Sequence, residues 1–200
     1  MRHRGLLFIV SAPSGGGKTT LCKKLLLTFH NSMAYSISVT TRKPRPGEKN
    51  GRDYWFVSNK QFFDMRKRKL LAEWAKVHDH YYGTPVKFMD DAIASGKDVL
   101  LDLDIKGAMK LKEKYHDAVC IFVAPPSWVE LEERIRLRNQ DSNKEIQRRL
   151  KNARKEMKFM PLYDHVIINQ KLSDALNVLK SIVIVERNRI ETERYGKKIK

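Results

Sequence analysis

The chain has 200 residues, of which 42% are hydrophobic and 32% charged, a balance typical of one globular domain that buries a core without disulfides or a structural metal. Its 40 Lys and Arg residues against 23 Asp and Glu give a formal net charge of +17, so polyanions such as nucleic acids or phosphorylated small molecules are the expected partners. Aromatic residues do not interleave with a basic stripe, which disfavours a single-strand nucleic-acid binder.

The cysteines and the hydropathy pattern bear on the compartment. The two cysteines, Cys22 and Cys120, show neither a disulfide framework nor metal-ligand spacing, which favours a reducing compartment. The apolar run at 6–10 is too short for a signal peptide, and no other run approaches the length of a membrane span. We therefore expect a cytoplasmic protein without a membrane partner.

The order of the apolar runs predicts the fold class. Four continuous runs are typical of strands buried on both faces, at 6–10, 99–103, 119–123 and 166–168. Helical patterns follow the first, second and last of them, at about 19–29, 105–115 and 172–189. Strands that alternate with helices predict an α/β fold, in which helices flank a parallel sheet.

Two regions depart from this alternation. Residues 35–82 are richer in aromatic and β-branched residues, and within them 54–57 and 71–77 are predicted to form strands of a small separate sheet. Residues 130–157 are charged and helical in period. We expect a single domain over 1–200, with a core formed by 1–34, 96–126 and 160–200 and with insertions at 35–95 and 127–159.

The sharpest local signal is a glycine-rich segment between the first strand and the first helix. Its glycines let backbone N–H groups surround a phosphate, the following helix adds positive potential, Lys18 can reach the β- and γ-phosphates, and Thr19 can ligate Mg²⁺. The strict pattern requires glycine where Ala12 stands, so a flexible turn that caps a helix is the alternative. The strand–loop–helix context favours phosphate binding. We therefore predict triphosphate contacts from Ala12, Pro13, Ser14, Gly15, Gly16, Gly17, Lys18, Thr19 and Thr20.

A phosphate loop also needs an acidic partner for the metal at the end of a neighbouring strand. Asp102 ends the apolar run at 99–103 and is expected to hold Mg²⁺ through water, together with the Thr19 hydroxyl. The alternative is that a strand-end aspartate caps the next helix, which suits Asp104 as well. Both interpretations can hold for the pair.

The phosphate acceptor must be identified from the first insertion. Arg42 and Arg45 are joined by a proline-stiffened turn and could direct two guanidinium groups at one phosphate, although a basic solvent loop has the same composition. Tyr54 and Tyr82 could add hydroxyl donors or simply pack in the core. Glu73 lies in a mostly apolar stretch, where a carboxylate is costly unless it is paired or faces a cleft. It could accept from the N1–H and N2–H₂ donors of guanine, which adenine lacks, or face water on an edge strand.

Together these segments resemble the guanylate kinases along essentially the whole chain. The motifs that carry the resemblance agree in order and spacing and lie at 11–20, 38–51, 52–54, 73–75, 81–84, 101–107 and 134–150. The resemblance implies a phosphate-loop kinase fold with a mixed GMP-binding insertion at 35–95 and a helical lid at 127–159. It also implies transfer of the γ-phosphoryl group of ATP to GMP, and to dGMP as well, with Mg²⁺.

The resemblance further implies a role for each matching residue. The GMP site would comprise Ser38, Arg42, Arg45, Tyr54, Glu73, Tyr82, Thr84, Asp102 and Asp104. Catalytic roles would fall to Lys18, Arg42, Asp102, Arg134, Arg138 and Arg149, and Asn169 would lie near the adenine of ATP. Asn139 stands where the family usually has glycine, so the resemblance does not fix the backbone geometry of the lid hinge at this position.

Other classes of function have recognisable signatures. Scaffold domains that resemble guanylate kinases bind phosphopeptides without catalysis, but typically lack an intact phosphate loop, whereas Gly17, Lys18 and Thr19 are present here. A different kinase acceptor is disfavoured by the guanine-reading set. We expect ATP and GMP as small-molecule partners and no specific nucleic acid; a homo-oligomer is compatible with the sequence.

Overall fold

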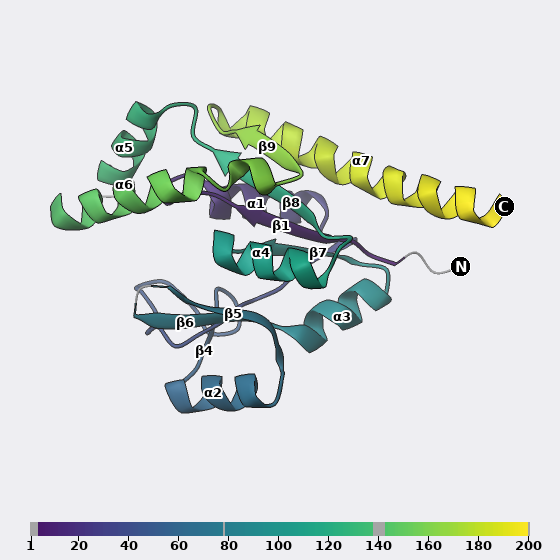
Figure 1. The fold of residues 1–200 in the computed structure, drawn as a ribbon, viewed down its shortest axis with the longest axis horizontal. Helices are drawn as coiled ribbons and strands as arrows, with labels where there is room; N and C mark the ends of the chain where they lie inside the picture. Colours follow the sequence, from purple (N-terminus) through teal and green to yellow (C-terminus); the bar gives the residue numbers. More distant parts are fainter. Residues whose placement is uncertain (1–3, 78, 138–142, 200) are drawn as a thin grey trace.

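The computed structural model describes residues 4–77, 79–137 and 143–199. Its central element is a five-stranded sheet in the order β2-β7-β1-β8-β9, in which every neighbouring pair is parallel (Figure 1). The strands are β1 (Leu7–Ser11), β2 (Met33–Tyr35), β7 (Asp98–Asp102), β8 (Val119–Ala124) and β9 (His165–Ile168). The predicted parallel sheet is thus confirmed.

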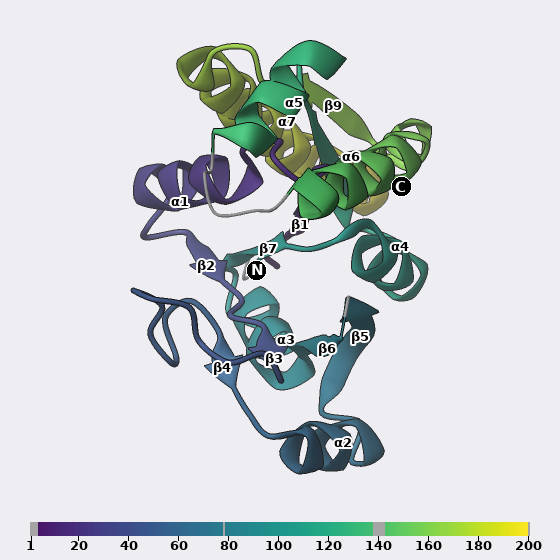
Figure 2. The same ribbon diagram turned by 90° about the vertical axis from the view of Figure 1, so that its left-hand side faces the viewer.

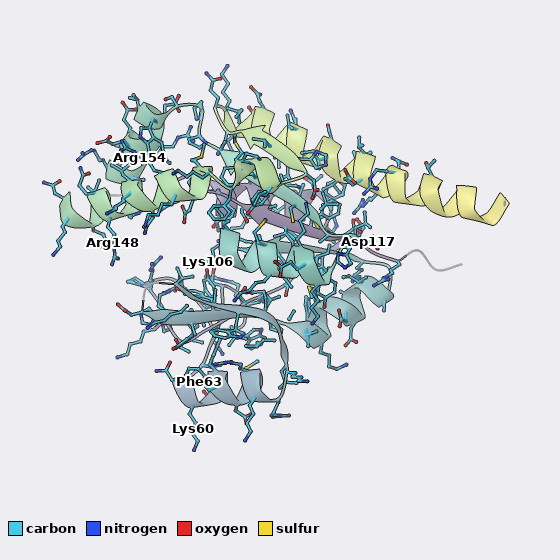
Figure 3. All side chains as sticks on the ribbon, in the orientation of Figure 1. Lys60, Phe63, Lys106, Asp117, Arg148 and Arg154 are labelled. Atoms are coloured by element: carbon cyan, nitrogen blue, oxygen red, sulfur yellow. The ribbon has the colours of Figure 1, made fainter. Side chains whose placement is uncertain are left out.

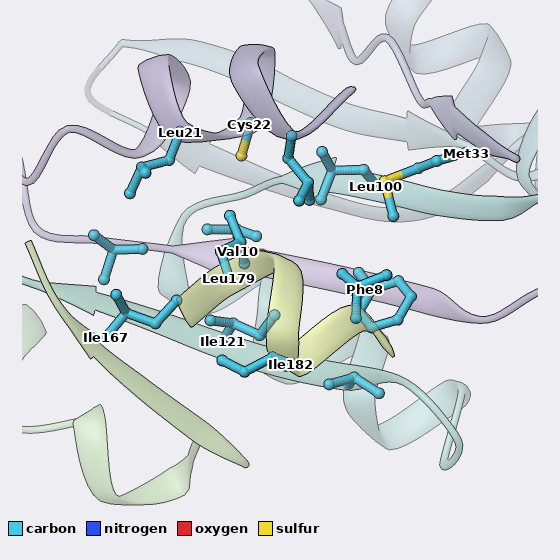
Figure 4. Packing of buried hydrophobic residues seen from close by; sticks show 14 of the residues in the cluster. Phe8, Val10, Leu21, Cys22, Met33, Leu100, Ile121, Ile167, Leu179 and Ile182 are labelled. Carbon is cyan, nitrogen blue, oxygen red and sulfur yellow. The ribbon is translucent and has the colours of Figure 1, made fainter. Parts of the chain in front are cut away.

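Helices cover both faces of this sheet, and β1 supplies side chains to both. Phe8 and Val10 pack with α1 (Lys18–Thr28) and α7 (Leu172–Ile199), as Figure 4 shows for part of this cluster. Leu7 and Ile9 pack on the other face with α3 (Val86–Ala94) and α4 (Ile105–Lys114). A strand that is buried on both faces needs apolar side chains at every position, which explains its unbroken apolar sequence.

A second, mixed sheet lies beside the core, in the order β4-β3-β6-β5. Its strands are β3 (Val39–Thr40), β4 (Trp55–Phe56), β5 (Leu71–Val77) and β6 (His80–Pro85), and α2 (Asn59–Lys67) packs on it through Phe62. The α2 helix begins with a reciprocal cap, in which the Ser58 hydroxyl accepts from the Gln61 backbone and the Gln61 side chain accepts from the Ser58 backbone.

The charged region that was predicted to be helical, at 130–157, forms two helices that pack on each other, α5 (Trp128–Arg136) and α6 (Asn143–Met157). They lie on the opposite side of the core from the small sheet (Figure 2). In Figure 3 the labelled Arg148 and Arg154 project from α6. A short 3₁₀ turn, η1 (Met160–Leu162), leads into β9.

The structure also differs from the sequence-based expectation. The final helix continues to Ile199 rather than ending near Arg189. Several elements were not predicted, namely β2, β3, α2 and α3, and of β6 only a strand-like segment around Tyr82 was expected. The strands β2 and β3 are too short to produce a periodic signal, since they span Met33–Tyr35 and Val39–Thr40. None of the helices within the described ranges is long and apolar enough to cross a membrane.

Candidate active site

The glycine-rich segment joins the carboxyl end of β1 to α1, at the centre of the parallel sheet. Gly15 and Gly17 have φ angles of 90° and 88°, values that residues with a Cβ rarely adopt. The Gly16 N–H donates to the Pro13 carbonyl at 2.9 Å and tightens the loop. The predicted strand–loop–helix context therefore holds, and it is the arrangement that aims backbone N–H groups and a helix N-terminus at a bound anion.

Lys18, Thr19 and Asp102 meet at the ends of β1 and β7. The Lys18 ammonium lies 2.6 Å from Asp102 Oδ1 and donates to the Leu103 carbonyl at 2.7 Å. The Thr19 hydroxyl donates to Asp102 Oδ2 at 3.0 Å. Burial alone would lower the pKa of Lys18, but the Asp102 carboxylate outweighs burial and holds the pKa above its ordinary value. Lys18 is therefore positively charged and is held in place by these contacts.

A cavity of about 260 Å³ extends from Lys18 toward the small sheet. Residues from both sheets line it, and they include Lys18, Ser38, Arg45, Tyr54, Glu73, Tyr82, Asp102 and Asp104. The cavity thus brings together most of the residues that the sequence assigned to the acceptor. Arg42 and Thr84 are not among its lining residues, but each is bonded to one that is.

Arg42 is held by a carboxylate and a phenol. Its Nη2 donates to Glu48 Oε1 at 2.8 Å, and its Nε donates to the Tyr82 hydroxyl at 3.2 Å. Glu48 also accepts from the Arg45 backbone N–H at 2.7 Å, so one carboxylate closes the turn that carries both arginines. Tyr54 packs edge-on to Tyr82, with ring centroids 5.9 Å apart. The turn is therefore an ordered structure rather than a loose basic loop.

Glu73 occupies the other end of the cavity. It lies on the edge strand β5 but is only 7% exposed, so it does not face bulk water. Its Oε1 accepts from the Thr84 hydroxyl at 2.8 Å. Burial raises the pKa of Glu73 to about 7, the Thr84 hydrogen bond opposes this shift, and the nearby Asp104 adds to it.

Asp104 and Gly107 complete that end of the cavity. Asp104 caps α4, because its Oδ1 accepts from the Gly107 N–H at 2.7 Å, so the capping alternative applies to Asp104. A Cβ at position 107 would lie 3.1 Å from Glu73 Oε2, so glycine leaves room for the carboxylate.

The helical insertion approaches the glycine-rich segment from the opposite side. Arg149 Nε donates to the Ser14 hydroxyl at 3.0 Å. Arg134 Nη2 donates to Glu130 Oε2 and to the Asn169 carbonyl, both at 2.9 Å. Two residues named from the sequence, Arg138 and Asn139, lie outside the described residues.

Sequence reasoning missed three groups of this site: the Glu48 carboxylate, the Leu103 carbonyl and the space at Gly107. Glu48 stands in the segment that carries Arg42 and Arg45, so a search for an acidic partner within one turn could have found it. A backbone carbonyl and an empty volume leave no signal in a single sequence.

The comparison with protein-family models decides the relationship. The model described as guanylate kinase matches residues 4–186. The chain belongs to the guanylate kinase family. Among curated relatives, the guanylate kinase of Geobacter metallireducens is 44% identical over 189 residues, which cover 94% of this chain and 93% of that protein. The guanylate kinase of Syntrophotalea carbinolica is 46% identical over 186 residues, which cover 93% and 88%.

A solved structure agrees with these relatives. The crystal structure of guanylate kinase from Anaplasma phagocytophilum superposes with a TM-score of 0.78 at 33% sequence identity, covering 93% of this chain and 88% of that one. The guanylate kinase fold therefore extends over the core sheet, the small mixed sheet and the paired helices described above.

Proposed function

We propose that this chain transfers the γ-phosphoryl group of ATP to GMP, giving ADP and GDP. One observation carries the proposal beyond family membership: a single cavity is lined both by Lys18 of the phosphate loop and by the buried carboxylate of Glu73. A triphosphate site and a base-recognition site therefore open into one space, as direct transfer between two nucleotides requires.

Guanine recognition is assigned to Glu73 and its neighbours. Guanine presents N1–H and N2–H₂ as adjacent donors, and an ionised Glu73 accepts from both. Thr84 orients the carboxylate through its hydrogen bond, while Ser38 and Asp104 line the same end of the cavity. Adenine would bury this carboxylate without any donor from the base, and a buried acceptor left unmatched by the substrate gives strong discrimination.

The phosphate of GMP is assigned to the other lining residues. Arg45, Tyr54 and Tyr82 line the same cavity as Glu73 and Lys18, and Arg42 is bonded to Tyr82. Guanidinium groups only donate and phenol groups can donate to phosphate oxygens, and the positive charge of the guanidinium groups favours an anion. We expect dGMP to be accepted as well.

ATP is assigned to the phosphate loop, with Lys18 and the backbone N–H groups of residues 12–20 around its phosphates. The residues present fit Mg²⁺, because Thr19 and Asp102 bring a hydroxyl and a carboxylate oxygen within 3.0 Å of each other, and hard oxygen donors suit this ion. Thr19 would bind the ion directly and Asp102 through water. When bound, Mg²⁺ neutralises charge on the transferring phosphates.

The transfer step needs positioning more than covalent chemistry. An oxygen of the GMP phosphate attacks the γ-phosphorus in line, the new P–O bond forms, and the bond to the β-phosphate oxygen breaks with ADP leaving. Lys18, Arg42, Arg134 and Arg149 lie around the site, and we assign them to the negative oxygens. Arg138 carries the same assignment from the sequence, outside the described residues.

Two moving parts would exclude water from this step. We propose that residues 35–95 act as the GMP-binding insertion and residues 127–159 as the lid, both closing on the core of 1–34, 96–126 and 160–200. The free buried thiols of Cys22 and Cys120 suit a cytoplasmic location.

A coupled ADP-release assay tests the proposal, with ATP, Mg²⁺ and a panel of GMP, dGMP, AMP, CMP and UMP. We expect turnover with GMP and dGMP far above the other acceptors. Lys18→Ala should abolish it, while Lys24→Ala, which removes an exposed lysine of the same helix, should leave it intact. Turnover with GMP no faster than with AMP would refute the proposal, and GMP binding without turnover would favour a non-catalytic binding module.

A further inference from the structure

Asn169 joins three separate parts of the molecule. It follows β9 directly and is only 5% exposed. Its backbone N–H donates to the Ala124 carbonyl at 2.8 Å, its side-chain Nδ2 donates to the Gly16 carbonyl at 2.8 Å, and its own carbonyl accepts from Arg134 Nη2 at 2.9 Å. One residue therefore connects the end of β8, the phosphate loop and helix α5.

The hydrogen bond from Asn169 to the Gly16 carbonyl holds the backbone of the phosphate loop. A carbonyl only accepts, so the amide nitrogen of Asn169 must face Gly16. The Gly16 N–H is held by the Pro13 carbonyl at 2.9 Å, so both backbone polar groups of this buried glycine are engaged. The N–H donor of Asn169 that faces Gly16 is committed to the loop and is not available to a nucleotide base.

Gly17, the next residue of the loop, lies directly against this amide. A Cβ at Gly17 would lie 2.4 Å from Asn169 Nδ2, closer than nonbonded atoms approach. Gly17 thus does more than adopt its φ of 88°. It leaves the space through which the Asn169 side chain reaches Gly16.

The contact with Arg134 places a lid arginine in the same arrangement. Arg134 lies on α5, and α5 also packs on the loop, since a Cβ at Gly15 would lie 3.0 Å from Ile135 and 3.2 Å from Leu131. The guanidinium of Arg134 is held by the main-chain carbonyl of Asn169, a contact that does not depend on the side chain at that position.

We propose that Asn169 is a positioning residue that holds the phosphate loop in its triphosphate-binding shape, rather than a residue that reads adenine. This inference rests on the proposed function and deepens it, because it assigns Asn169 to the phosphates of the donor and not to its base. It predicts that the loss of the side chain weakens every ligand of the loop by the same factor, whether or not the ligand carries a base.

Two substitutions separate the possibilities. Asn169→Ala removes the bond and leaves the buried Gly16 carbonyl unpaired, so we expect the KM for ATP to rise about tenfold. Asn169→Asp keeps the shape but turns an oxygen toward the carbonyl, so we expect a larger rise. The GMP KM should change less than about twofold, and kcat less than about threefold, because the main-chain contact with Arg134 remains.

The decisive probe is inorganic tripolyphosphate, which has no base. Its inhibition constant against ATP should rise in Asn169→Ala by the same factor as the ATP KM. A tripolyphosphate constant that stays unchanged while the ATP KM rises would overturn the proposal in favour of adenine recognition. An unchanged ATP KM would overturn it as well.

The controls distinguish positioning from general loss of structure. Asn188→Ala removes an exposed amide of α7 that donates to Ile184 of the same helix, and it should change none of these constants. Equal losses in the GMP and ATP KM values of Asn169→Ala, with a matching fall in the unfolding temperature, would also overturn the proposal. A wild-type protein without GMP-dependent ADP release would refute the proposed function instead, and the tripolyphosphate comparison could still be made by direct binding.

Discussion

Replacement of Glu73 by glutamine should stabilise the free protein and impair its use of GMP. The side chain is 7% exposed, and burial raises its pKa to about 7 from the ordinary 4.5. A carboxyl that ionises near pH 7 when folded but near 4.5 when unfolded costs about 3 kcal/mol of stability above pH 7. Glutamine removes that charge and keeps an oxygen that accepts from Thr84.

The sign of the effect sets the pH window. Below about pH 4.5 the carboxyl is protonated in both states, so its ionisation costs nothing there. The cost grows as the pH rises between 4.5 and about 7, because the unfolded state releases the proton first, and it is constant above that. The stability gained by Glu73→Gln should therefore be absent near pH 4.5 and complete by about pH 8.

The loss with GMP comes from the same carboxylate. Glutamine places an N–H₂ donor where guanine also presents donors, so one or two hydrogen bonds to a charged group are lost. Such bonds contribute about 1.5–3 kcal/mol, so we expect kcat/KM for GMP to fall by about 10–150-fold while the KM for ATP is unchanged. In the wild-type protein the GMP KM should also rise as the pH falls below about 7, because ionised Glu73 is the form that binds.

Thermal unfolding at several pH values and steady-state kinetics measure the two effects. The GMP phosphate titrates near pH 6 as well, so the pH profile of Glu73→Gln serves as the reference for the wild-type profile. Glu113→Gln, at an exposed position on α4, controls for the removal of one charge. A Glu73→Gln protein that is less stable than wild type at about pH 8, or one that retains the GMP preference, would refute the reasoning.

Two further substitutions test one contact beside the site and one in the core. Glu48→Gln weakens the partner of Arg42 and the brace of the Arg45 turn, so the GMP KM should rise about tenfold with little change for ATP; equal effects on both substrates in steady-state kinetics would contradict this assignment. Asp98→Ala removes a buried carboxylate that pairs with Arg187 at 2.5 Å and accepts from the Leu6 N–H at 2.8 Å. It should lower the free energy of unfolding by about 3 kcal/mol, measured by urea denaturation, and a loss below about 1 kcal/mol would show that the pair is dispensable.

Much of the core follows from local sequence alone. The apolar runs at 6–10, 99–103 and 119–123 became the central strands, because strands buried on both faces need apolar residues throughout. The glycine-rich segment, with the strand before it and the helix after it, placed the phosphate loop. For Glu73 the sequence left two possibilities open, guanine recognition and exposure to water, and the resemblance chose between them, because burial of this residue is not visible in the stretch Leu-Ala-Glu-Trp-Ala.

The remaining features depend on contacts between distant segments. The strand β2 has only Met33–Tyr35 and is held by its pairing with β7, so its own sequence carries little signal. Asn169 bonds to a carbonyl 153 positions away. This bond could not be inferred from the apolar run of β9, which ends one residue earlier, because the acceptor is a backbone atom that any residue would provide.

The composition suggests a site with a large excess of positive charge, but several cations of the site are paired with carboxylates. Lys18 is paired with Asp102, Arg42 with Glu48, and Arg134 with Glu130. Each carboxylate holds its cation in place and reduces the repulsion between neighbouring cations before any phosphate arrives. A bound phosphate must then compete with the carboxylate or share the cation with it. The carboxylates therefore weaken the attraction of the site for phosphate, but they hold its cations in position before a nucleotide binds. For the same reason, the net charge of +17 overstates the positive potential that an incoming nucleotide meets at the site.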